Sequence, residues 1–255
     1  MRLSIAIITY NRLEFFRKCL ESVLQTTSEL EKEIILWDNG STDGTAEYIK
    51  EISDKYKFLI PVLNKKNIGV NAKGKVFEIS KGEYIACLDD DILELPENWA
   101  EKMMSAFDSD RKLGYLSLDV IQNEHTTGAK LPEDAYKEKI LGNGLILQTG
   151  PAGGWCFMIS RRVYNTVGKF RQAKGKIFFG EDGDYVIRCR LKGFFSAILK
   201  DVKCFHATGP YYNEKYMEIF ENKMSDLKKN KIDIHVLKVK TGQIINKIIK
   251  TGKKS

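Results

Sequence analysis

The sequence lacks several features that would direct it to particular classes of protein. No apolar run approaches the roughly 18 to 20 residues that a helix needs to cross a bilayer. The N-terminus, MRLSIAIITYNR, does not show a basic region followed by a long apolar core and a cleavage site, so it is interpreted as a first strand and not as a signal peptide. We therefore expect a soluble protein located in the cytoplasm.

Paired cysteines are missing as well. The five cysteines form no CxxC pair, and four of them lie inside apolar segments where any small hydrophobic residue would serve equally well. Reduced cysteines in the core or at the surface are the expected outcome. Only three histidines occur, and two of them, His125 and His235, have no neighbouring residues that suggest a metal site.

Positive charge is in excess, but it is not concentrated. The net charge is +7, the lysines are spread along the chain, and no stretch interleaves basic with aromatic residues as single-strand binders do. This disfavours a nucleic-acid partner. Attraction to anionic substrates or anionic lipid explains the charge more simply.

A chain of 255 residues is long enough for one α/β domain. Over its first two-thirds, short apolar runs alternate with segments of helical period. The alternation predicts a mostly parallel central sheet with helices on both faces, as in Rossmann-like folds. The expected strands are Leu3 to Tyr10, Glu33 to Asp38, Phe58 to Leu63 and Tyr84 to Leu88. Three helices are expected between them. The first begins at about Leu13, the second is capped by Ser41 or Thr42, and the third begins at about Asn71.

The pattern is less regular after about Leu95. It predicts a helix near Asn98 to Phe107, a strand near Tyr115 to Val120, a polar loop from Gln122 to Glu138, a strand, turn and helix around Leu145 to Val167, a helix from Glu181 to Lys192, and two short strands at Ser196 to Leu199 and Lys203 to His206. The final forty residues contain a charged helix and a tail rich in lysine and isoleucine.

Polar clusters follow the first four predicted strands, at Thr9 to Arg12, Asp38 to Asp43, Asn64 to Asn71 and Asp89 to Asp91. In an open parallel sheet, ligands bind outside the carboxyl ends of the strands. The last cluster carries three adjacent carboxylates, which repel one another unless a cation or donor groups compensate them. A divalent ion held by oxygen ligands is one solution, and an ordinary acidic turn or helix cap is the alternative.

Six fragments in this order resemble a family 2 glycosyltransferase of the GT-A fold, and the resemblance covers roughly residues 3 to 209. The fragments are TYNR, WDNGSTDGT, NKKNIGVNAKGK, CLDDD, GGWCFMISRR and GEDGDYVIRCRLKG. It implies a catalytic domain at 1–209, divided into a nucleotide-binding half at 1–95 and an acceptor-binding half at 96–209 with a small acceptor-side extension. Residues 210–255 would form a C-terminal helix and a basic tail.

The resemblance also assigns roles to individual residues. The expected nucleotide-binding residues are Thr9, Tyr10, Arg12, Asp38, Asn67, Gly69, Asn71, Lys73, Asp89 and Asp90, with Asp89 near the ribose. An aspartate that accepts a hydrogen bond from the base and a lysine that offsets phosphate charge suit these positions. Tyr10 as a packing residue and Asp38 as a turn-forming residue are the alternatives. The neighbouring Lys65 and Lys66 fit a solvated pair.

On the sugar side, Gly153, Gly154 and Trp155 match the segment that approaches the donor sugar and the acceptor, with a tryptophan face suited to stacking on a sugar ring. Core packing of the tryptophan is the alternative. Glu181 and Asp182 match the family's ED motif, in which Asp182 would be the catalytic base and Glu181 would orient the acceptor. An acidic first helical turn is the structural explanation for the same pair.

For the metal, the resemblance implies Mn²⁺ or Mg²⁺ held by Asp91 of the DXD motif and by His206 in CFHATG. A structural histidine at a strand end is the alternative. The implied reaction is an inverting transfer of a hexosyl or N-acetylhexosaminyl group from a nucleoside-diphosphate sugar, with UDP favoured by family habit. A sugar nucleotidyltransferase and a catalytically silent nucleotide- or sugar-binding module are the rival functions.

The expected acceptor is a hydroxyl group on a sugar, lipid-linked or protein-linked, in glycan, polysaccharide or glycolipid synthesis. The tail KVKTGQIINKIIKTGKKS combines isoleucines at near-helical spacing with lysines. Such a segment suits peripheral contact with an anionic membrane, where lipid-linked acceptors lie. A solvated tail is the simpler alternative.

Overall fold

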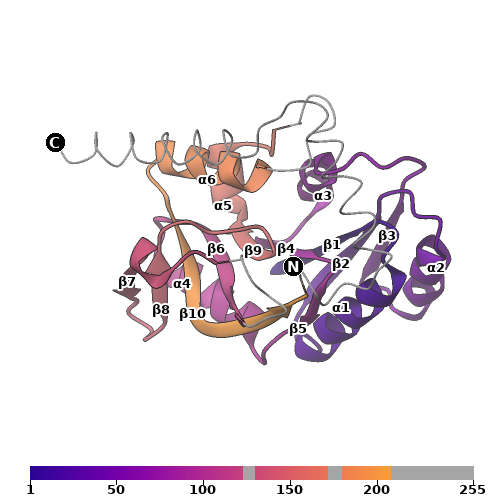
Figure 1. Cartoon of the computed structure of the whole chain (residues 1–255), viewed down its shortest axis with the longest axis horizontal. Helices are drawn as coiled ribbons and strands as arrows, with labels where there is room; N and C mark the ends of the chain where they lie inside the picture. Colours follow the sequence, from indigo (N-terminus) through magenta and orange to yellow (C-terminus); the bar gives the residue numbers. More distant parts are fainter. Residues whose placement is uncertain (123–129, 172–179, 208–255) are drawn as a thin grey trace. The chain divides into compact units, whose positions relative to one another are not determined.

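The computed structural model of the chain describes residues 1–122, 130–171 and 180–207 (Figure 1). The helices are α1 (Leu13–Thr26), α2 (Thr45–Lys55), α3 (Asn71–Ile79), α4 (Trp99–Ser109), α5 (Arg161–Val167) and α6 (Glu181–Leu191), with a 3-10 turn, η1 (Glu133–Ala135). The strands are β1 (Leu3–Thr9), β2 (Lys32–Asp38), β3 (Leu59–Leu63), β4 (Tyr84–Asp89), β5 (Ile92–Glu94), β6 (Leu113–Val120), β7 (Lys137–Ile140), β8 (Ile146–Thr149), β9 (Cys156–Ser160) and β10 (Phe195–His206).

The described strands form one central sheet in the order β3-β2-β1-β4-β9-β6-β10-β8-β7, and β5 pairs with the end of β10. The four strands β3, β2, β1 and β4 are parallel neighbours, as the alternating sequence pattern predicts. Strand β9 lies antiparallel between β4 and β6, and β6 pairs in parallel with β10. The predicted α/β class is confirmed, with a parallel first half and a mixed second half.

Helices cover both faces of the sheet because the buried strands present apolar residues in both directions. On one face, Leu3, Ile5 and Ile7 of β1 pack in a core with residues of α1, α2 and α4. On the other face, Ala6 of β1 belongs to a second core that includes Phe77 of α3 and residues of α5 and α6. Figure 1 shows α3, α5 and α6 above the sheet and α1 below it. The loops at the carboxyl ends of the strands therefore lie between two fixed layers.

Two details of the secondary structure differ from the sequence prediction. Helix α2 is not capped by Ser41 or Thr42: it begins after Gly44, which has a φ of 92°. The reason is that the Ser41 hydroxyl and the Thr42 backbone N–H are both hydrogen-bonded to Asn11, in the loop after β1. These residues tie two loops together instead of ending a helix.

The second difference concerns the two short strands expected between Ser196 and His206, which are a single strand, β10. Its pairing with β6 shifts register between Leu199 and Lys203, and Asp201 has a φ of 64°. A bulge of this kind bends the strand without ending it. The short strands β5 and β7 were not predicted, and β7 begins at Lys137, inside the expected polar loop; residues 123–129 of that loop and the tail from residue 208 lie outside the described residues.

Candidate active site

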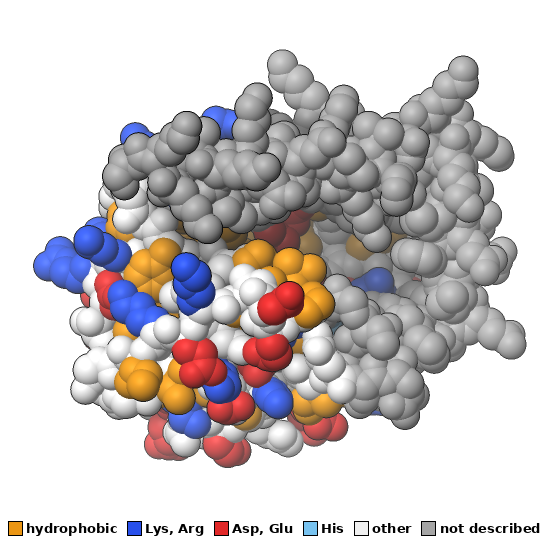
Figure 2. Space-filling model, turned by 60° about the vertical axis from the view of Figure 1, so that its left-hand side comes forward, with side chains coloured by type: hydrophobic (Ala, Val, Ile, Leu, Met, Phe, Trp, Pro, Cys, Tyr) orange, Lys and Arg blue, Asp and Glu red, His pale blue; other side chains and the backbone are white. Residues whose placement is uncertain are grey.

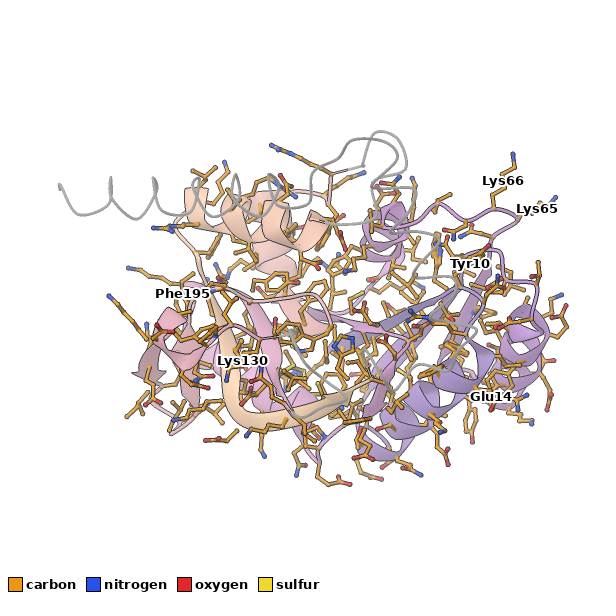
Figure 3. All side chains as sticks on the ribbon, in the orientation of Figure 1. Tyr10, Glu14, Lys65, Lys66, Lys130 and Phe195 are labelled. Atoms are coloured by element: carbon orange, nitrogen blue, oxygen red, sulfur yellow. The ribbon has the colours of Figure 1, made fainter. Side chains whose placement is uncertain are left out.

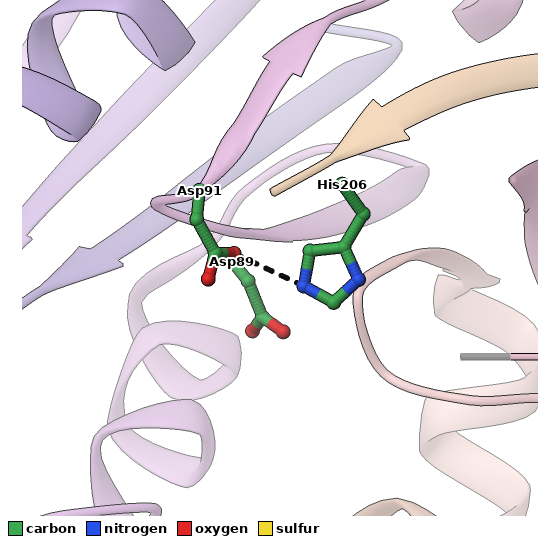
Figure 4. Close-up of side chains that lie close together, drawn as sticks. All are labelled: Asp89, Asp91 and His206. Carbon is green, nitrogen blue, oxygen red and sulfur yellow. Dashed lines mark ion pairs between the residues drawn. The ribbon is translucent and has the colours of Figure 1, made fainter. Parts of the chain in front are cut away.

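An acidic cluster with one histidine lies where β4 and β10 end. Asp89 is the last residue of β4, Asp91 follows it, and His206 is the last residue of β10. The pairing of β10 with β5 sets His206 opposite Ile92, and the Ala207 N–H donates to the Asp91 carbonyl at 2.9 Å. One ligand atom from each of Asp89, Asp91 and His206 lies within 4.8 Å of the others (Figure 4).

The donor set of this cluster fits a divalent cation. The Nε2 atom of His206 lies 3.1 Å from Oδ1 of Asp91, and adjacent ligands around an octahedral ion about 2.1 Å away are separated by about 3 Å. Two carboxylates and an imidazole suit manganese-type ions. Among the described residues, Nδ1 of His206 is buried and has no hydrogen-bond partner, so the ring is held through Nε2 alone.

The charge balance of the cluster also favours a cation. Burial and repulsion from Asp91 raise the pKa of Asp89 to about 7, although Lys73 and His206 act in the opposite direction. Burial also raises the pKa of Asp90, against the lowering effect of Arg12. Burial lowers the pKa of His206, but the Asp91 carboxylate outweighs this and raises it. A bound ion would offset the burial and the mutual repulsion that raise the pKa values of the two aspartates.

Arg12, in the loop between β1 and α1, links the acidic residues to the first strand. Its Nη1 lies 3.0 Å from Oδ1 of Asp90 and 2.9 Å from Oδ2 of Asp91, and both carboxylates are nearly fully buried. Because Oδ1 of Asp91 faces His206 while Oδ2 faces Arg12, the arginine orients a candidate metal ligand. Sequence reasoning assigned Arg12 to the nucleotide, and this contact with Asp91 was not foreseen.

A second charged group is built around Lys73 in the first turn of α3. The Lys73 ammonium lies 2.8 Å from Oε1 of Glu181 and 2.9 Å from Oδ1 of Asp182, both in the first turn of α6. Burial lowers the pKa of Lys73, but Asp182, Asp89 and Glu181 raise it well above its ordinary value. The lysine is therefore a fixed positive charge beside the ED pair.

The segment from Gly153 to Trp155 joins the two groups. The Asp89 N–H donates to the Trp155 carbonyl at 2.8 Å, and Gly154 lies against the side chain of Asp182. In addition, Asp182 contributes to the raised pKa of Asp89. The acidic cluster, the glycine segment and the ED pair thus belong to one site.

Trp155 itself packs in the core. Only 6% of its surface is exposed, and its indole N–H donates to the Leu118 carbonyl at 3.1 Å. This geometry corresponds to the core-packing alternative, and the predicted stacking on a sugar ring remains a prediction. The Gly153 carbonyl accepts a hydrogen bond from the Ser117 hydroxyl at 2.6 Å, which fixes the segment to β6.

The expected nucleotide-binding loops lie side by side at the ends of β2 and β3. The Asp38 carboxylate accepts hydrogen bonds from the Ser41 N–H, which is the turn-forming role that was the alternative for this residue. Asn39, which sequence reasoning treated as a turn residue, donates to Oδ1 of Asn67 and accepts from the Ile68 N–H. Gly69, with a φ of 57°, lies in the same loop. Asn39 is the residue that connects the two loops.

The remaining predicted nucleotide residues differ in exposure. Thr9 is buried at the end of β1, and Asn71 is half-buried at the start of α3. Tyr10 is 43% exposed, so it is not a core-packing residue (Figure 3). Lys65 and Lys66 are exposed and point away from the fold in Figure 3, which agrees with a solvated pair. The nucleotide-binding roles of these residues remain predictions.

The sequence profile of the family described as Glycosyl transferase family 2 matches residues 4–168. The chain therefore belongs to this family, and its fold is the GT-A fold of the solved structures that it resembles. An uncharacterised glycosyltransferase of Nostoc sp. is 30% identical over 167 residues, which cover 62% of this chain and 48% of the relative. For the uncharacterised glycosyltransferase YibD of Escherichia coli the identity is 30%, with 53% and 40% covered.

Two groups of solved structures show the same fold. A mannosyltransferase of Pyrobaculum calidifontis in complex with GDP-Man and Mn²⁺ matches with a TM-score of 0.65 and 18% identity, covering 82% of this chain and 57% of that one. The S. aureus TarS fragment 1–349 in complex with UDP-GlcNAc matches with a TM-score of 0.61 and 16% identity, covering 83% and 60%. The matched region spans 26% to 48% of the length of the first curated relatives and 57% to 60% of these two solved chains.

No helix among residues 1–122, 130–171 and 180–207 is both long and apolar enough to cross a bilayer. On the face shown in Figure 2, the described Lys and Arg side chains are interspersed with Asp, Glu and apolar side chains. Charge on this part of the surface is therefore mixed.

Proposed function

We propose that this chain is a metal-dependent, inverting glycosyltransferase that moves a sugar from a nucleoside diphosphate to an acceptor hydroxyl. The observation that carries the proposal is the continuous set of contacts from Asp89 and Asp91 through Trp155 and Gly154 to Asp182. It joins a candidate cation site to a carboxylate that can serve as a base, and these are the two groups that such a transfer needs.

Asp182 is the proposed base. Its side chain is 23% exposed, whereas that of Glu181 is 11% exposed and also pairs with Lys73. The acceptor oxygen attacks the anomeric carbon, the bond from that carbon to the phosphate oxygen breaks, and its electron pair leaves with the nucleoside diphosphate. The hydroxyl proton passes to the Asp182 carboxylate. One displacement of this kind inverts the anomeric centre.

A retaining double displacement is the less favoured mechanism. It needs a carboxylate nucleophile close to the sugar. Glu181 is the neighbouring candidate, but its oxygen lies 2.8 Å from the Lys73 ammonium and its side chain is largely buried. Asp182 has the same lysine contact but is 23% exposed, so it is the lower exposure of Glu181, 11%, that limits its access to the anomeric carbon.

Asp91 and His206 are the proposed metal ligands, and Asp89 is a third candidate because it lies in the same cluster. A Mn²⁺ or Mg²⁺ ion here would stabilise the negative charge that develops on the departing diphosphate. Arg12 holds Asp91 in place from the opposite side. Asp90 is also paired with Arg12 and is buried, so we propose that it supports the arginine instead of contacting the ion.

The donor is proposed to be a UDP-sugar, because the family resemblance favours UDP as the nucleotide and TarS is solved with UDP-GlcNAc. The mannosyltransferase solved with GDP-Man and Mn²⁺ supports a nucleotide sugar and a metal, but its nucleotide carries guanine and not uracil. The loop that contains Asn67 and Gly69 lies beside Asp38, at the end of the sheet where the nucleobase of the donor is expected. The transferred group would be a hexose or an N-acetylhexosamine.

For the acceptor, we propose a sugar hydroxyl in glycan, polysaccharide or glycolipid synthesis. A poly(ribitol-phosphate) beta-glucosyltransferase of Bacillus spizizenii is 32% identical over 94 residues, which cover 36% of this chain and 15% of that protein. The name of this relative supports a polymer that carries free hydroxyl groups, such as poly(ribitol-phosphate), as one acceptor class. The tail expected to contact an anionic membrane lies outside the described residues, and peripheral attachment at the inner face of the membrane remains a prediction.

The test is a thermal-shift screen of UDP-, GDP- and dTDP-sugars with and without manganese, followed by transfer assays with the selected donor. We expect one donor to stabilise the protein in the presence of manganese, because a ligand that binds only the folded state raises its stability. Asp182→Asn should lower transfer by about a hundredfold or more. Normal transfer by this variant would disprove the assignment of the base.

The same assays separate the rival functions. A sugar nucleotidyltransferase would release pyrophosphate in place of a nucleoside diphosphate. A silent binding module would be stabilised by a nucleotide sugar and would show neither transfer nor hydrolysis with any acceptor. Only the appearance of a nucleoside diphosphate together with a glycosylated acceptor agrees with the proposal.

A further inference from the structure

The side chain of Lys73 is committed to the ED pair. It is 9% exposed, and its ammonium lies within 3 Å of both Glu181 and Asp182. A buried ammonium is costly unless opposite charges compensate it, and removal of one partner leaves the other charge uncompensated. The lysine, expected from the sequence to meet the diphosphate, is thus occupied by two carboxylates.

Gly154 lies on another side of the same carboxylate. A Cβ added to Gly154 would lie 1.9 Å from Oδ2 of Asp182 and 2.4 Å from its Cγ, and both distances are far shorter than any real contact. The backbone of Gly154 is not in the left-handed region, so its conformation alone does not require glycine. The missing side chain is what makes room for Asp182.

The segment that carries Gly154 is held firmly. The Ser117 hydroxyl donates to the Gly153 carbonyl at 2.6 Å, and the Trp155 indole N–H donates to the Leu118 carbonyl at 3.1 Å. Both hydrogen bonds reach residues of β6, which lies inside the sheet. An added methyl group would therefore displace the Asp182 side chain more readily than the glycine backbone.

We propose that Lys73 and Gly154 are positioning residues that hold the Asp182 carboxylate in a fixed slot, Lys73 through its opposite charge and Gly154 through its lack of a side chain. The inference rests on the proposed function, in which Asp182 removes the acceptor proton. It replaces the expectation that these two residues contact the diphosphate and the sugar. A displacement of the base by 1 Å is enough to cost about a hundredfold in rate.

The first experiment compares Lys73→Met, Lys73→Arg and Lys75→Met. Lys75 is the matched control, because it lies on the same helix, is exposed, and pairs only with Glu78 in the described structure. For Lys73→Met we expect kcat to fall about a hundredfold while the dissociation constant of the donor stays within about threefold. Lys73→Arg should recover part of kcat, and Lys75→Met should resemble the wild type.

A phosphate-binding role for Lys73 predicts a different result. The dissociation constant and KM of the donor would then rise about tenfold or more in Lys73→Met, whereas kcat would change less. That outcome overturns the proposal. Donor binding is measured by titration calorimetry with manganese present, so that it is obtained independently of turnover.

The second experiment compares Gly154→Ala with Gly183→Ala. A Cβ at Gly183, in the first turn of α6, meets no described atom within 4 Å, so this substitution is the steric control. Gly154→Ala should lower kcat about a hundredfold with little change in donor affinity. An increase in donor or acceptor KM at unchanged kcat would assign Gly154 to substrate contact and overturn its positioning role.

A stability measurement tests the Lys73 contact without any turnover. In a double-mutant cycle of Lys73→Met and Asp182→Asn, the two losses of thermal stability should not be additive, because the second substitution removes a charge that the first leaves uncompensated. Additive effects would overturn the contact. If the wild type transfers no sugar from any donor, the proposed function fails, and this cycle still decides whether Lys73 holds Asp182.

Discussion

Two groups of acidic residues share one site, and their charges are balanced in different ways. In the ED pair, Glu181 and Asp182 both contact the buried ammonium of Lys73. In the other group, Asp89, Asp90 and Asp91 face Arg12 and His206, and burial together with mutual repulsion still raises the pKa of Asp89 to about 7. The first group has its own counter-charge, and the second fits an additional cation.

The difference separates the tasks of the two groups. A carboxylate that must accept a proton has to stay in one orientation, and an internal lysine provides this in every state of the enzyme. A carboxylate that must hold a divalent ion is better left short of positive charge, because the ion then supplies the missing charge itself. The contrast predicts that the two groups respond differently to metal, pH and substitution.

The largest expected effect is the loss of metal-dependent transfer in Asp91→Asn. The substitution removes one charge from the candidate ligand nearest to His206. A metal ion contributes several kcal/mol to such a reaction, so we expect transfer with manganese to fall about a thousandfold. Calorimetric titration with manganese should show weak or no binding, and the exposed Asp54→Asn serves as the control. Manganese binding equal to that of the wild type would remove Asp91 from the ligand set.

The next effect is a pH dependence that belongs only to the acidic cluster. In protein treated with a chelator, the raised pKa of Asp89 means that the folded state keeps a proton which the unfolded state loses. Stability should then fall as pH rises from about 4 through about 7, by at most about 4 kcal/mol. Asp89→Asn should reduce this slope, which denaturant unfolding at pH 5 and pH 8 measures, and the part that remains belongs to the raised pKa values of Asp90 and His206. An unchanged slope in the variant would assign the effect elsewhere.

A smaller loss is expected for Arg12→Gln, because Arg12 contacts Asp91, a proposed metal ligand. Outer residues that orient a metal ligand typically contribute 10- to 100-fold in metal affinity, and we expect a decrease of about this size. Arg17→Gln is the matched control, because Arg17 is exposed on α1, the helix that follows Arg12, and lies over the Tyr48 ring. If Arg12→Gln binds manganese as tightly as Arg17→Gln, the arginine serves the nucleotide alone.

Periodicity in the sequence predicted the parallel half of the fold well. Each of the strands β1 to β4 is rich in apolar residues and ends at a polar cluster, so the position of the site follows from the topology of parallel sheets. The second half was harder to predict because β9 and β10 pair with strands distant in sequence. The bulge near Asp201 was missed for a different reason: its residues resemble a turn, so the sequence suggested that one strand ends there and another begins.

Within the site, the motifs predicted which residues meet but not how they are paired. Asp91 and His206 were expected at one ion, and the structure brings Asp89 to them as well. The contact from Lys73 to Asp182 joins residues 109 positions apart in sequence, and no local pattern signals it. A short motif indicates the residue types of a site, whereas packing between helices decides their partners.

The smallest expected effect concerns the thiols, two of which lie next to the two charged groups. Cys19 has its sulfur 3.6 Å from the Asp89 carbonyl, and burial together with Asp90 and Asp91 raises its pKa. Burial also raises the pKa of Cys87, to about 12, although Lys73 acts to lower it. Because the thiolate is the reactive form, neither cysteine should react with an aromatic disulfide reagent at pH 8 while the protein is folded.

Spectrophotometric labelling of native and denatured protein checks this expectation. All five cysteines are free and buried, so five thiols should react in denaturant and none should react rapidly before it is added. Rapid native labelling of Cys87 alone would mean that Lys73 stabilises its thiolate strongly, and that this lysine is therefore not fully committed to Glu181 and Asp182. Rapid labelling of Cys19 would instead mean that the acidic cluster opens to solvent in the absence of metal.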